Sequence, residues 1–232
     1  MNELPKGWVR AEIGDLCQPI TKIDPRLYAD QSFTYIDIGA IDAGISQVRS
    51  PKALLGADAP SRARQVVAEG DTLISTVRVY LRNTALVPEA LSGAVASTGF
   101  CVLRPAPGID PKFLFYRTLE SGFVNDLSSR QTGSSYPAVR DADVKRMSIG
   151  VPPLSEQRRI VDAIEEHFSR IDSGSTALDR TRLRQKRLNV VVLNAAITGR
   201  LQYPDLAVRG QFPVRGFGHQ MSAPLAVMFN SR

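Results

Sequence analysis

A long helical pattern directly behind two prolines constrains this chain more than any other feature of its sequence. After Pro152 and Pro153, apolar residues recur mostly at steps of three and four until Gly199, which is the spacing of one helix face. We expect a helix over residues 154–200, about 65 Å long at about 1.5 Å per residue. Ser155 is the predicted N-cap, with Glu156 in the first turn. The apolar stripe consists of Ile160, Ile164, Phe168, Ile171, Leu178, Leu188 and Val192.

Such a helix needs a surface to pack against. A narrow apolar stripe on a long helix usually pairs with another helix, so we expect a coiled-coil-like contact with a second chain. In the alternative, the segment "DSGSTA" at 172–177 interrupts the helix, and two shorter pieces fold back on their own domain. The sequence leaves both arrangements open.

The charges of this segment are divided along its length. Acidic residues dominate the first half, at Glu156, Asp162, Glu165, Glu166 and Asp172. Basic residues dominate the second half, at Arg180, Arg182, Arg184, Lys186 and Arg187. Two antiparallel copies would bring acidic halves beside basic halves. The same division also suits a single solvated helix, because acids stabilise a helix N-terminus and bases stabilise its C-terminus.

The first 150 residues predict a mixed α/β (α+β) domain of many short strands and few helices. Strands are expected in "SFTYIDIGAID", "RQVVAEGDTLIST", "NTALVP" and "STGFCVLRP", where β-branched and aromatic residues stand between turn signals. Helices are expected in "WVRAEIGDLC" and in "DPKFLFYRTLESGFVNDL", the second with Asp110 as its cap and Pro111 in its first turn. Residues 201–232 lack periodicity and predict a disordered tail.

The charge and hydropathy of the sequence limit the kinds of partner and the cellular compartment that we expect for this chain. A net charge of +6 over 232 residues favours a polyanion, and the basic residues recur through the body of the chain, as expected for a folded surface. No segment has the roughly 20 apolar residues of a membrane span or the order of a signal peptide, so we expect a cytoplasmic protein without a membrane partner. Cys17 and Cys101 form no metal-binding motif and are predicted to be small core residues.

The sequence contains few residues in patterns that are typical of a catalytic site. The two histidines, His167 and His219, cannot furnish a convincing catalytic triad or histidine-rich metal site, and the common phosphate-binding glycine loops are missing from the sequence. Asp37 and Asp42 could form a nuclease-type carboxylate pair for Mg²⁺. Their simpler interpretation is a role at strand ends and in a turn.

Several motifs together resemble the specificity subunit of type I restriction-modification systems. They occur in the family's order and span residues 4–201 nearly completely. The most specific is "VPPLSEQRRIV" at 151–161. The others are "LPKGW" at 4–8, "YIDIGAIDAG" at 35–44, "GDTLISTVR" at 70–78, "STGFCVLRP" at 97–105, "QTGSSYP" at 131–137 and "LNAAITGRL" at 193–201.

The resemblance implies a division of labour. Residues 1–153 would form a target recognition domain that reads half of a split site in double-stranded DNA, and residues 154–200 a conserved spacer helix. Methyltransferase (modification) subunits and a restriction subunit would be the partners, and S-adenosylmethionine, ATP and Mg²⁺ would belong to them. For this chain the resemblance implies no catalytic, cofactor or metal site.

The chain departs from the family pattern in having one recognition domain and one spacer helix where the usual subunit has two of each. We therefore expect a half-subunit that pairs with a second copy of itself, antiparallel, to read an interrupted palindrome. A truncation or a shifted frame would account for the tail. A remnant that binds modification subunits without directing them is the alternative.

Candidate DNA contacts lie in turn-rich stretches, because a recognition domain needs arginines for phosphates and side chains that reach base edges. Residues from Gln131 to Tyr136 equally suit a loop that supports the domain. The candidates are Arg62, Arg64, Arg78, Tyr80, Arg82, Asn83, Arg130, Gln131, Ser134, Ser135 and Tyr136.

Overall fold

The computed structural model describes residues 4–197, with side chains described as far as Ile171 and at some positions beyond it. The chain divides into two units, Met1–Ser173 and Gly174–Arg232, which are taken separately. The strands are β1 (Val9–Glu12), β2 (Cys17–Gln18), β3 (Ser32–Ile36), β4 (Ile41–Asp42), β5 (Gln47–Val48), β6 (Lys52–Leu55), β7 (Ala63–Val66), β8 (Thr72–Ser75), β9 (Thr84–Leu86), β10 (Val95–Ser97), β11 (Phe100–Pro105) and β12 (Ser148–Val151). The α-helices are α1 (Pro111–Leu119), α2 (Ser121–Ser129), α3 (Asp141–Lys145) and α4 (Leu154–Ile197).

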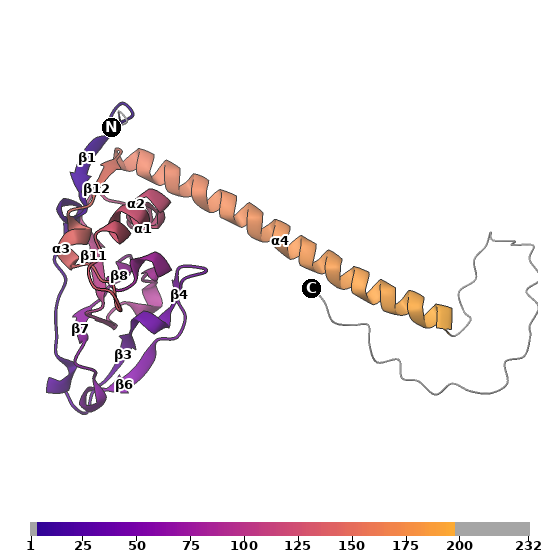
Figure 1. The fold of residues 1–232 in the computed structure, drawn as a ribbon, viewed down its shortest axis with the longest axis horizontal. Coiled ribbons are helices and arrows are strands. Elements are labelled where there is room, and N and C mark those ends of the chain that lie inside the picture. Colours follow the sequence, from indigo (N-terminus) through magenta and orange to yellow (C-terminus); the bar gives the residue numbers. More distant parts are fainter. Residues whose placement is uncertain (1–3, 198–232) are drawn as a thin grey trace, which may run out of the picture. The chain divides into compact units, whose positions relative to one another are not determined.

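Two four-stranded sheets form the frame of the first unit, with the strand orders β6-β3-β10-β7 and β2-β11-β8-β9. Figure 1 labels β3, β6 and β7 of the first sheet and β8 and β11 of the second. The chain crosses from the first sheet to the second twice, between β7 and β8 and between β10 and β11. Gln65, which is buried, holds the second crossing, because its side-chain amide donates to the carbonyl oxygens of Ser97 and Phe100. A buried amide paired in this way fixes a corner that apolar packing alone would leave free to shift.

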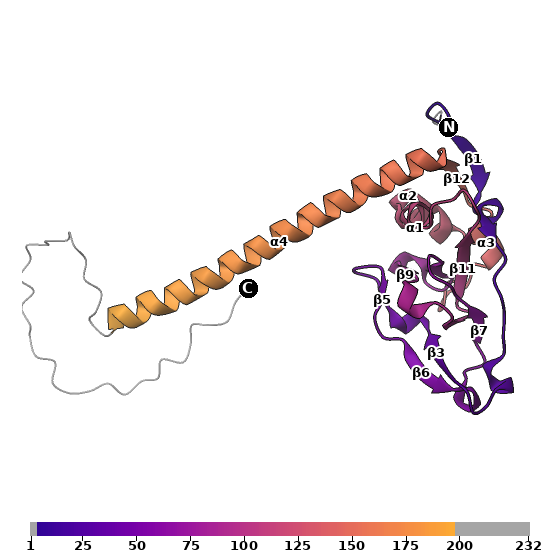
Figure 2. The same cartoon turned by 180° about the vertical axis from the view of Figure 1, so that it is seen from behind.

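Apolar side chains gather in two main clusters. The first joins residues of both sheets, among them Ile36, Leu73 and Phe100. The second packs helix residues such as Leu114 and Phe123 against the sheet of β8 and β11, and α1 and α2 lie on that side of the unit (Figures 1 and 2). The predicted mixed α/β domain of short strands and few helices is confirmed.

Local signals located most elements correctly. The strands predicted in "RQVVAEGDTLIST", "NTALVP" and "STGFCVLRP" are present as β7, β8, β9 and β11. Asp110 caps α1 as predicted, with its carboxylate accepting from the backbone N–H groups of Lys112 and Phe113, and Pro111 opens the helix. Cys101 is buried as predicted, whereas Cys17 is half-buried at the edge of the second cluster, and both thiols are free.

Three local predictions were wrong. The segment "WVRAEIGDLC" is not a helix but β1 followed by a 3-10 turn (Ile13–Leu16), because β1 pairs antiparallel with β12, far away in sequence. The segment "DPKFLFYRTLESGFVNDL" forms two helices, since Glu120 between them is extended, with φ −59° and ψ 134°. Ser155 is not the N-cap of α4, which begins one residue earlier at Leu154 and leaves Ser155 inside its first turn.

The joint between β12 and α4 is tightly built. Gln157, 1% exposed, accepts a hydrogen bond from the Asp110 N–H at 2.8 Å and donates to the carbonyl oxygens of Gly108 and Pro152. Helix α4 continues without interruption through residues 172–177. The predicted tail at 201–232 and His219 lie outside the described residues. Within the described range, no helix is long and apolar enough to cross a membrane.

Candidate nucleic-acid interface

Two loops far apart in sequence lie side by side on the first unit. The first loop, residues 76–83, joins β8 to β9, and the second loop, residues 130–139, follows α2. The backbone N–H of Arg78 donates to Pro137 O at 2.8 Å, and the N–H of Val139 donates to Thr76 O at 2.9 Å. These bonds bring together most of the residues that the sequence singled out.

Arg78 and Tyr136 form the contact at the centre of this pair of loops. The guanidinium carbon of Arg78 lies 4.9 Å from the centroid of the Tyr136 ring, and Arg78 Nη2 reaches Ser135 O at 3.5 Å. Tyr136 is 72% exposed, so its ring presents an open face beside a positive charge. An arginine held over an aromatic ring keeps its charge while losing conformational freedom.

Gln131 holds the first loop in place. Its side-chain oxygen accepts from the Val79 N–H at 2.9 Å, and its side-chain nitrogen donates to Ser128 O at 3.1 Å. Both ends of this amide are therefore engaged within the protein. The geometry favours the supporting role for Gln131 over a contact with a base edge.

The other candidate residues of these loops differ in their side-chain contacts and in their exposure. Arg82 donates to the Ser121 hydroxyl at 3.1 Å, whereas Arg130 is ion-paired with Asp126 at 3.3 Å. Among the described residues, neither Arg78 nor Arg82 pairs with a carboxylate. Tyr80, Ser134 and Ser135 are exposed, and Asn83 is half-buried.

Arg62 and Arg64 are not part of this cluster. Arg62 lines a shallow cavity of about 390 Å³ together with Asp37 and Lys52. Arg64 is paired with Asp24 at 3.1 Å, and Asp24 also binds Arg26. That double pairing, chiefly the hydrogen bond from Arg26, lowers the pKa of Asp24 to about 2.

The turn at Thr98 and Gly99 connects these two regions. The Thr98 N–H donates to Arg62 O at 2.8 Å, and Gly99 O accepts from the Thr76 N–H at 2.9 Å. A Cβ at Gly99 would lie 2.8 Å from Ile38 Cδ1, so a larger residue in this turn would require the end of the Ile38 side chain to shift. The backbone therefore links the cavity at Arg62 directly to the first loop.

Asp37 and Asp42 are engaged as structural groups. Asp37 is ion-paired with Lys52 at 2.7 Å, and this contact raises the pKa of Lys52. Asp42 accepts from the Gly44 N–H at 2.9 Å inside the turn between β4 and β5. Among the side chains that the structure describes, no three from His, Cys, Asp or Glu are placed to hold a metal ion together.

The predicted stripe of α4 is not uniform in the part whose side chains are described. Ile160 and Ile164 are half-buried and line a small cavity with Trp8 and α1. Phe168 and Ile171 are 52% and 63% exposed. The first pair therefore contributes to the unit's own packing, and the second pair is open. The side chains of Leu178, Leu188 and Val192 lie outside the described set.

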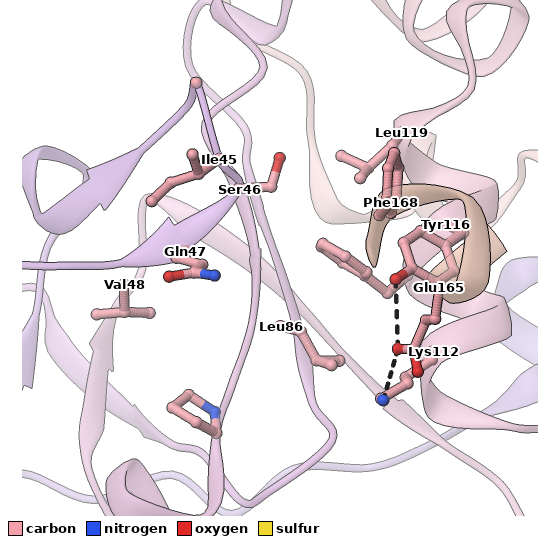
Figure 3. Close-up of a pocket in the computed structure, with 13 residues that line it drawn as sticks. Ile45, Ser46, Gln47, Val48, Leu86, Lys112, Tyr116, Leu119, Glu165 and Phe168 are labelled. Atoms are coloured by element: carbon pink, nitrogen blue, oxygen red, sulfur yellow. Dashed lines mark hydrogen bonds and ion pairs between the residues drawn. The ribbon is translucent and has the colours of Figure 1, made fainter. Parts of the chain in front are cut away.

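A groove of about 790 Å³ adjoins the open part of the stripe. Ile45 and Val48 of the β4–β5 hairpin line one side, and Tyr116 of α1 with Phe168 of α4 lines the other (Figure 3). The two rings lie 6.1 Å apart. Below the rings, Glu165 pairs with Lys112 and accepts a hydrogen bond from the Tyr116 hydroxyl. The hydrogen bond between Lys112 and Glu165 raises the pKa of Lys112.

Sequence reasoning missed two residues of functional interest. Leu81, beside Tyr80, is 46% exposed, and the signal was a large apolar residue inside an otherwise basic loop. Gln157 was missed as the buried centre of the joint, although it belongs to the Pro-Pro-Leu-Ser-Glu-Gln run that the sequence marked as its most specific motif.

Comparison with known protein families gives one match over most of the chain. Residues 5–179 match the model described as "Type I restriction modification DNA specificity domain". The type I restriction enzyme StySPI specificity subunit of Salmonella potsdam is 30% identical over 103 residues, which are 44% of this chain and 22% of that subunit.

Solved structures agree with this match. The HsdS subunit from Thermoanaerobacter tengcongensis is 38% identical, with a TM-score of 0.75, over 89% of this chain and 53% of that one. A chain from a study of complex assembly and conformational transition of the type I R-M system is also 38% identical, with a TM-score of 0.71 and the same coverage. The matched region thus spans about half of these solved chains and less of the StySPI subunit.

Proposed function

The chain belongs to the family of type I restriction-modification DNA specificity domains, and from that premise we propose that it reads a sequence in double-stranded DNA. It acts without catalysis of its own. Methyltransferase subunits and a restriction subunit would carry out adenine methylation and cleavage at the site that it selects. S-adenosylmethionine, ATP and Mg²⁺ would be bound by those partners.

The observation that carries this proposal is the pairing of the two loops around Arg78 and Tyr136. Arg78 and Arg82 have no carboxylate partner among the described residues, so both charges remain available to phosphates. Tyr80 and Tyr136 stand exposed beside them. The two loops are joined by backbone hydrogen bonds. Loops that combine arginines without a carboxylate partner with exposed aromatic rings suit a nucleic-acid surface better than a solvated protein surface.

Selection of bound duplexes from a random pool, followed by fluorescence anisotropy at several salt concentrations, tests DNA recognition. The purified chain should enrich one sequence, and log affinity should fall linearly with log salt. Arg82→Gln should weaken binding and reduce the slope by about 0.9, the contribution of one phosphate. Arg26→Gln is the matched control, since Arg26 is paired with Asp24 outside both loops. Failure to enrich any sequence would contradict the proposal.

We further propose that α4 pairs with α4 of a second copy in antiparallel fashion. Phe168 and Ile171 are exposed apolar residues on adjacent turns, and the acidic first half of the helix complements its basic second half. A two-fold pair would present two recognition units to a bipartite DNA site, with the gap set by the helices. The same helices would offer modification subunits a docking surface.

Sedimentation velocity of the full chain with Ile171→Asp tests this pairing. The wild-type chain should sediment as a dimer, and the variant as a monomer, because a charge would replace an apolar contact at the interface. Ser169→Asp, which adds the same charge to a different face of the helix, should leave the dimer intact. A monomeric wild-type chain, or a dimer that tolerates Ile171→Asp, would contradict the pairing.

A further inference from the structure

Two large apolar side chains stand together at the end of the first loop. Tyr80 is 53% exposed and Leu81 is 46% exposed, and both belong to the 3-10 turn Val79–Leu81. Within the described residues, neither side chain forms a hydrogen bond or a ring contact. We call this pair the Tyr80–Leu81 tip. Such a pair at a basic surface is the kind of exposed apolar patch that marks a contact site.

The residues on either side of the tip have a backbone conformation that is unfavourable for them. Arg78 has φ 50° and Arg82 has φ 55°, so residues with a Cβ take the left-handed conformation on both sides of the tip. Steric crowding makes this conformation uncommon outside glycine. Strained backbone of this kind persists where the surroundings enforce it, and it concentrates at functional sites.

A network beneath the tip enforces this shape. Val79 is 4% exposed and anchors the turn in the apolar core, while its N–H is bound by Gln131. The N–H groups of Leu81 and Arg82 donate to the carbonyl oxygens of Arg78 and Val79, at 2.8 and 2.9 Å. The tip is therefore presented as a rigid feature and does not need to become ordered when it binds.

Charge identifies the surface that the tip would meet. Arg78 and Arg82 stand on either side of it in the sequence, and neither pairs with a carboxylate in the described part of the chain. A protein partner with an apolar pocket would not require two unpaired arginines there. Nucleic acid requires both components, because its phosphates attract arginines and its stacked bases accept apolar side chains.

We infer that the Tyr80–Leu81 tip enters the DNA duplex as a wedge, separating two adjacent bases while Arg78 and Arg82 bind the flanking phosphates. This inference rests on the proposed function and adds a mode of recognition to it. Apolar wedges partly unstack a base step and bend the duplex. Because steps differ in how easily they unstack, the wedge would contribute sequence preference without a hydrogen bond to a base.

The experiment uses the duplex that the full chain selects from a random pool, with 2-aminopurine placed in turn at each adenine in and beside the site. Unstacking should raise its fluorescence severalfold at one step when the wild-type chain binds. Tyr80→Ala and Leu81→Ala should abolish that rise and weaken binding at least tenfold, with an unchanged salt slope because no phosphate contact is lost.

Matched variants separate the wedge from other effects. Tyr80→Phe should retain the fluorescence rise, since the ring and not its hydroxyl enters the stack. Leu55→Ala, at a leucine of similar exposure on β6 (48%), should behave as the wild type. Near-ultraviolet circular dichroism of each variant checks that the fold is intact.

Two results would overturn the inference while leaving the proposed function in place. One is selective binding by the wild-type chain without a fluorescence rise at any position. The other is wild-type DNA binding by Tyr80→Ala and Leu81→Ala, combined with loss of binding to the modification subunit, which would make the tip a protein contact. Absence of DNA binding by the wild-type chain would instead refute the proposed function itself.

Discussion

Replacement of Gln157 by alanine tests the physical account of the joint between the recognition unit and α4. The amide of Gln157 accepts from the Asp110 N–H at 2.8 Å and donates to Pro152 O at 3.0 Å and Gly108 O at 3.2 Å. Truncation leaves at least two poorly solvated backbone groups without partners, and each such group costs about 1–3 kcal/mol. With the loss of side-chain packing, we expect a total of about 3–5 kcal/mol.

Guanidinium titration of the purified chain measures this loss. Trp8 is the single tryptophan and lines a cavity with Ile160 and Ile164, so its emission reports on the joint, while circular dichroism at 222 nm reports on helix content. Arg158→Ala is the control on the same turn, because Arg158 is exposed and should change the unfolding free energy by less than about 0.5 kcal/mol. Equal effects of the two substitutions would refute the reasoning.

Replacement of Gln157 by glutamate should make the stability of the folded chain depend on pH. Burial raises the pKa of the introduced carboxyl above its value in the unfolded chain, because the charged form would face two carbonyl oxygens. The folded state then holds the proton more tightly than the unfolded state. Stability relative to the wild type should therefore be greatest at acid pH and should fall as pH rises above about 4.3, the ordinary value for Glu. A pH-independent difference would contradict this.

Three further predictions follow from other contacts. Asp71, 1% exposed, forms a two-bond pair with Arg104, so Asp71→Asn should lower the unfolding free energy by about 3 kcal/mol, and a loss below 1 kcal/mol would show that the pair adds little. Burial raises the pKa of the Cys17 thiol to about 11 and that of Cys101 further. Iodoacetamide at pH 8 should therefore alkylate both thiols slowly while the chain is folded and faster once it unfolds, as followed by mass spectrometry. Gly174 has open space around its Cα within α4, so Gly174→Ala should stabilise the helix by about 1 kcal/mol, visible as a higher thermal midpoint. An unchanged thermal unfolding midpoint would contradict the helical conformation of Gly174.

Elements whose determinants are local could be predicted from the sequence. The strands β7 and β8 are bounded by an evident turn, and Asp110 and Pro111 mark the start of α1 within a few residues. The segment that forms β1 carries a helical apolar rhythm, yet its register is set by β12, more than a hundred residues later. No local pattern contains that partner, so tertiary pairing overrode local preference.

The candidate site shows the same limit. Composition marked Arg78 and Tyr136 separately, but their contact depends on how the first and second loops fold together. Gln131 suited both a base contact and a supporting role in the sequence, and only its two hydrogen bonds distinguish between them. Ile164 belongs to the apolar stripe, yet it faces Trp8 of its own unit, which makes Ile171 the better position for testing association.

Comparison of DNA methylation in cells with and without this gene, read by sequencing that detects N6-methyladenine, tests the central claim most directly. We predict one bipartite adenine motif that is fully methylated when the gene is present. The motif should lose its methylation on deletion and regain it when the chain is restored, but not when the restored chain carries Tyr80→Ala and Arg82→Gln together. An identical methylation pattern in the presence and absence of the gene would contradict the account.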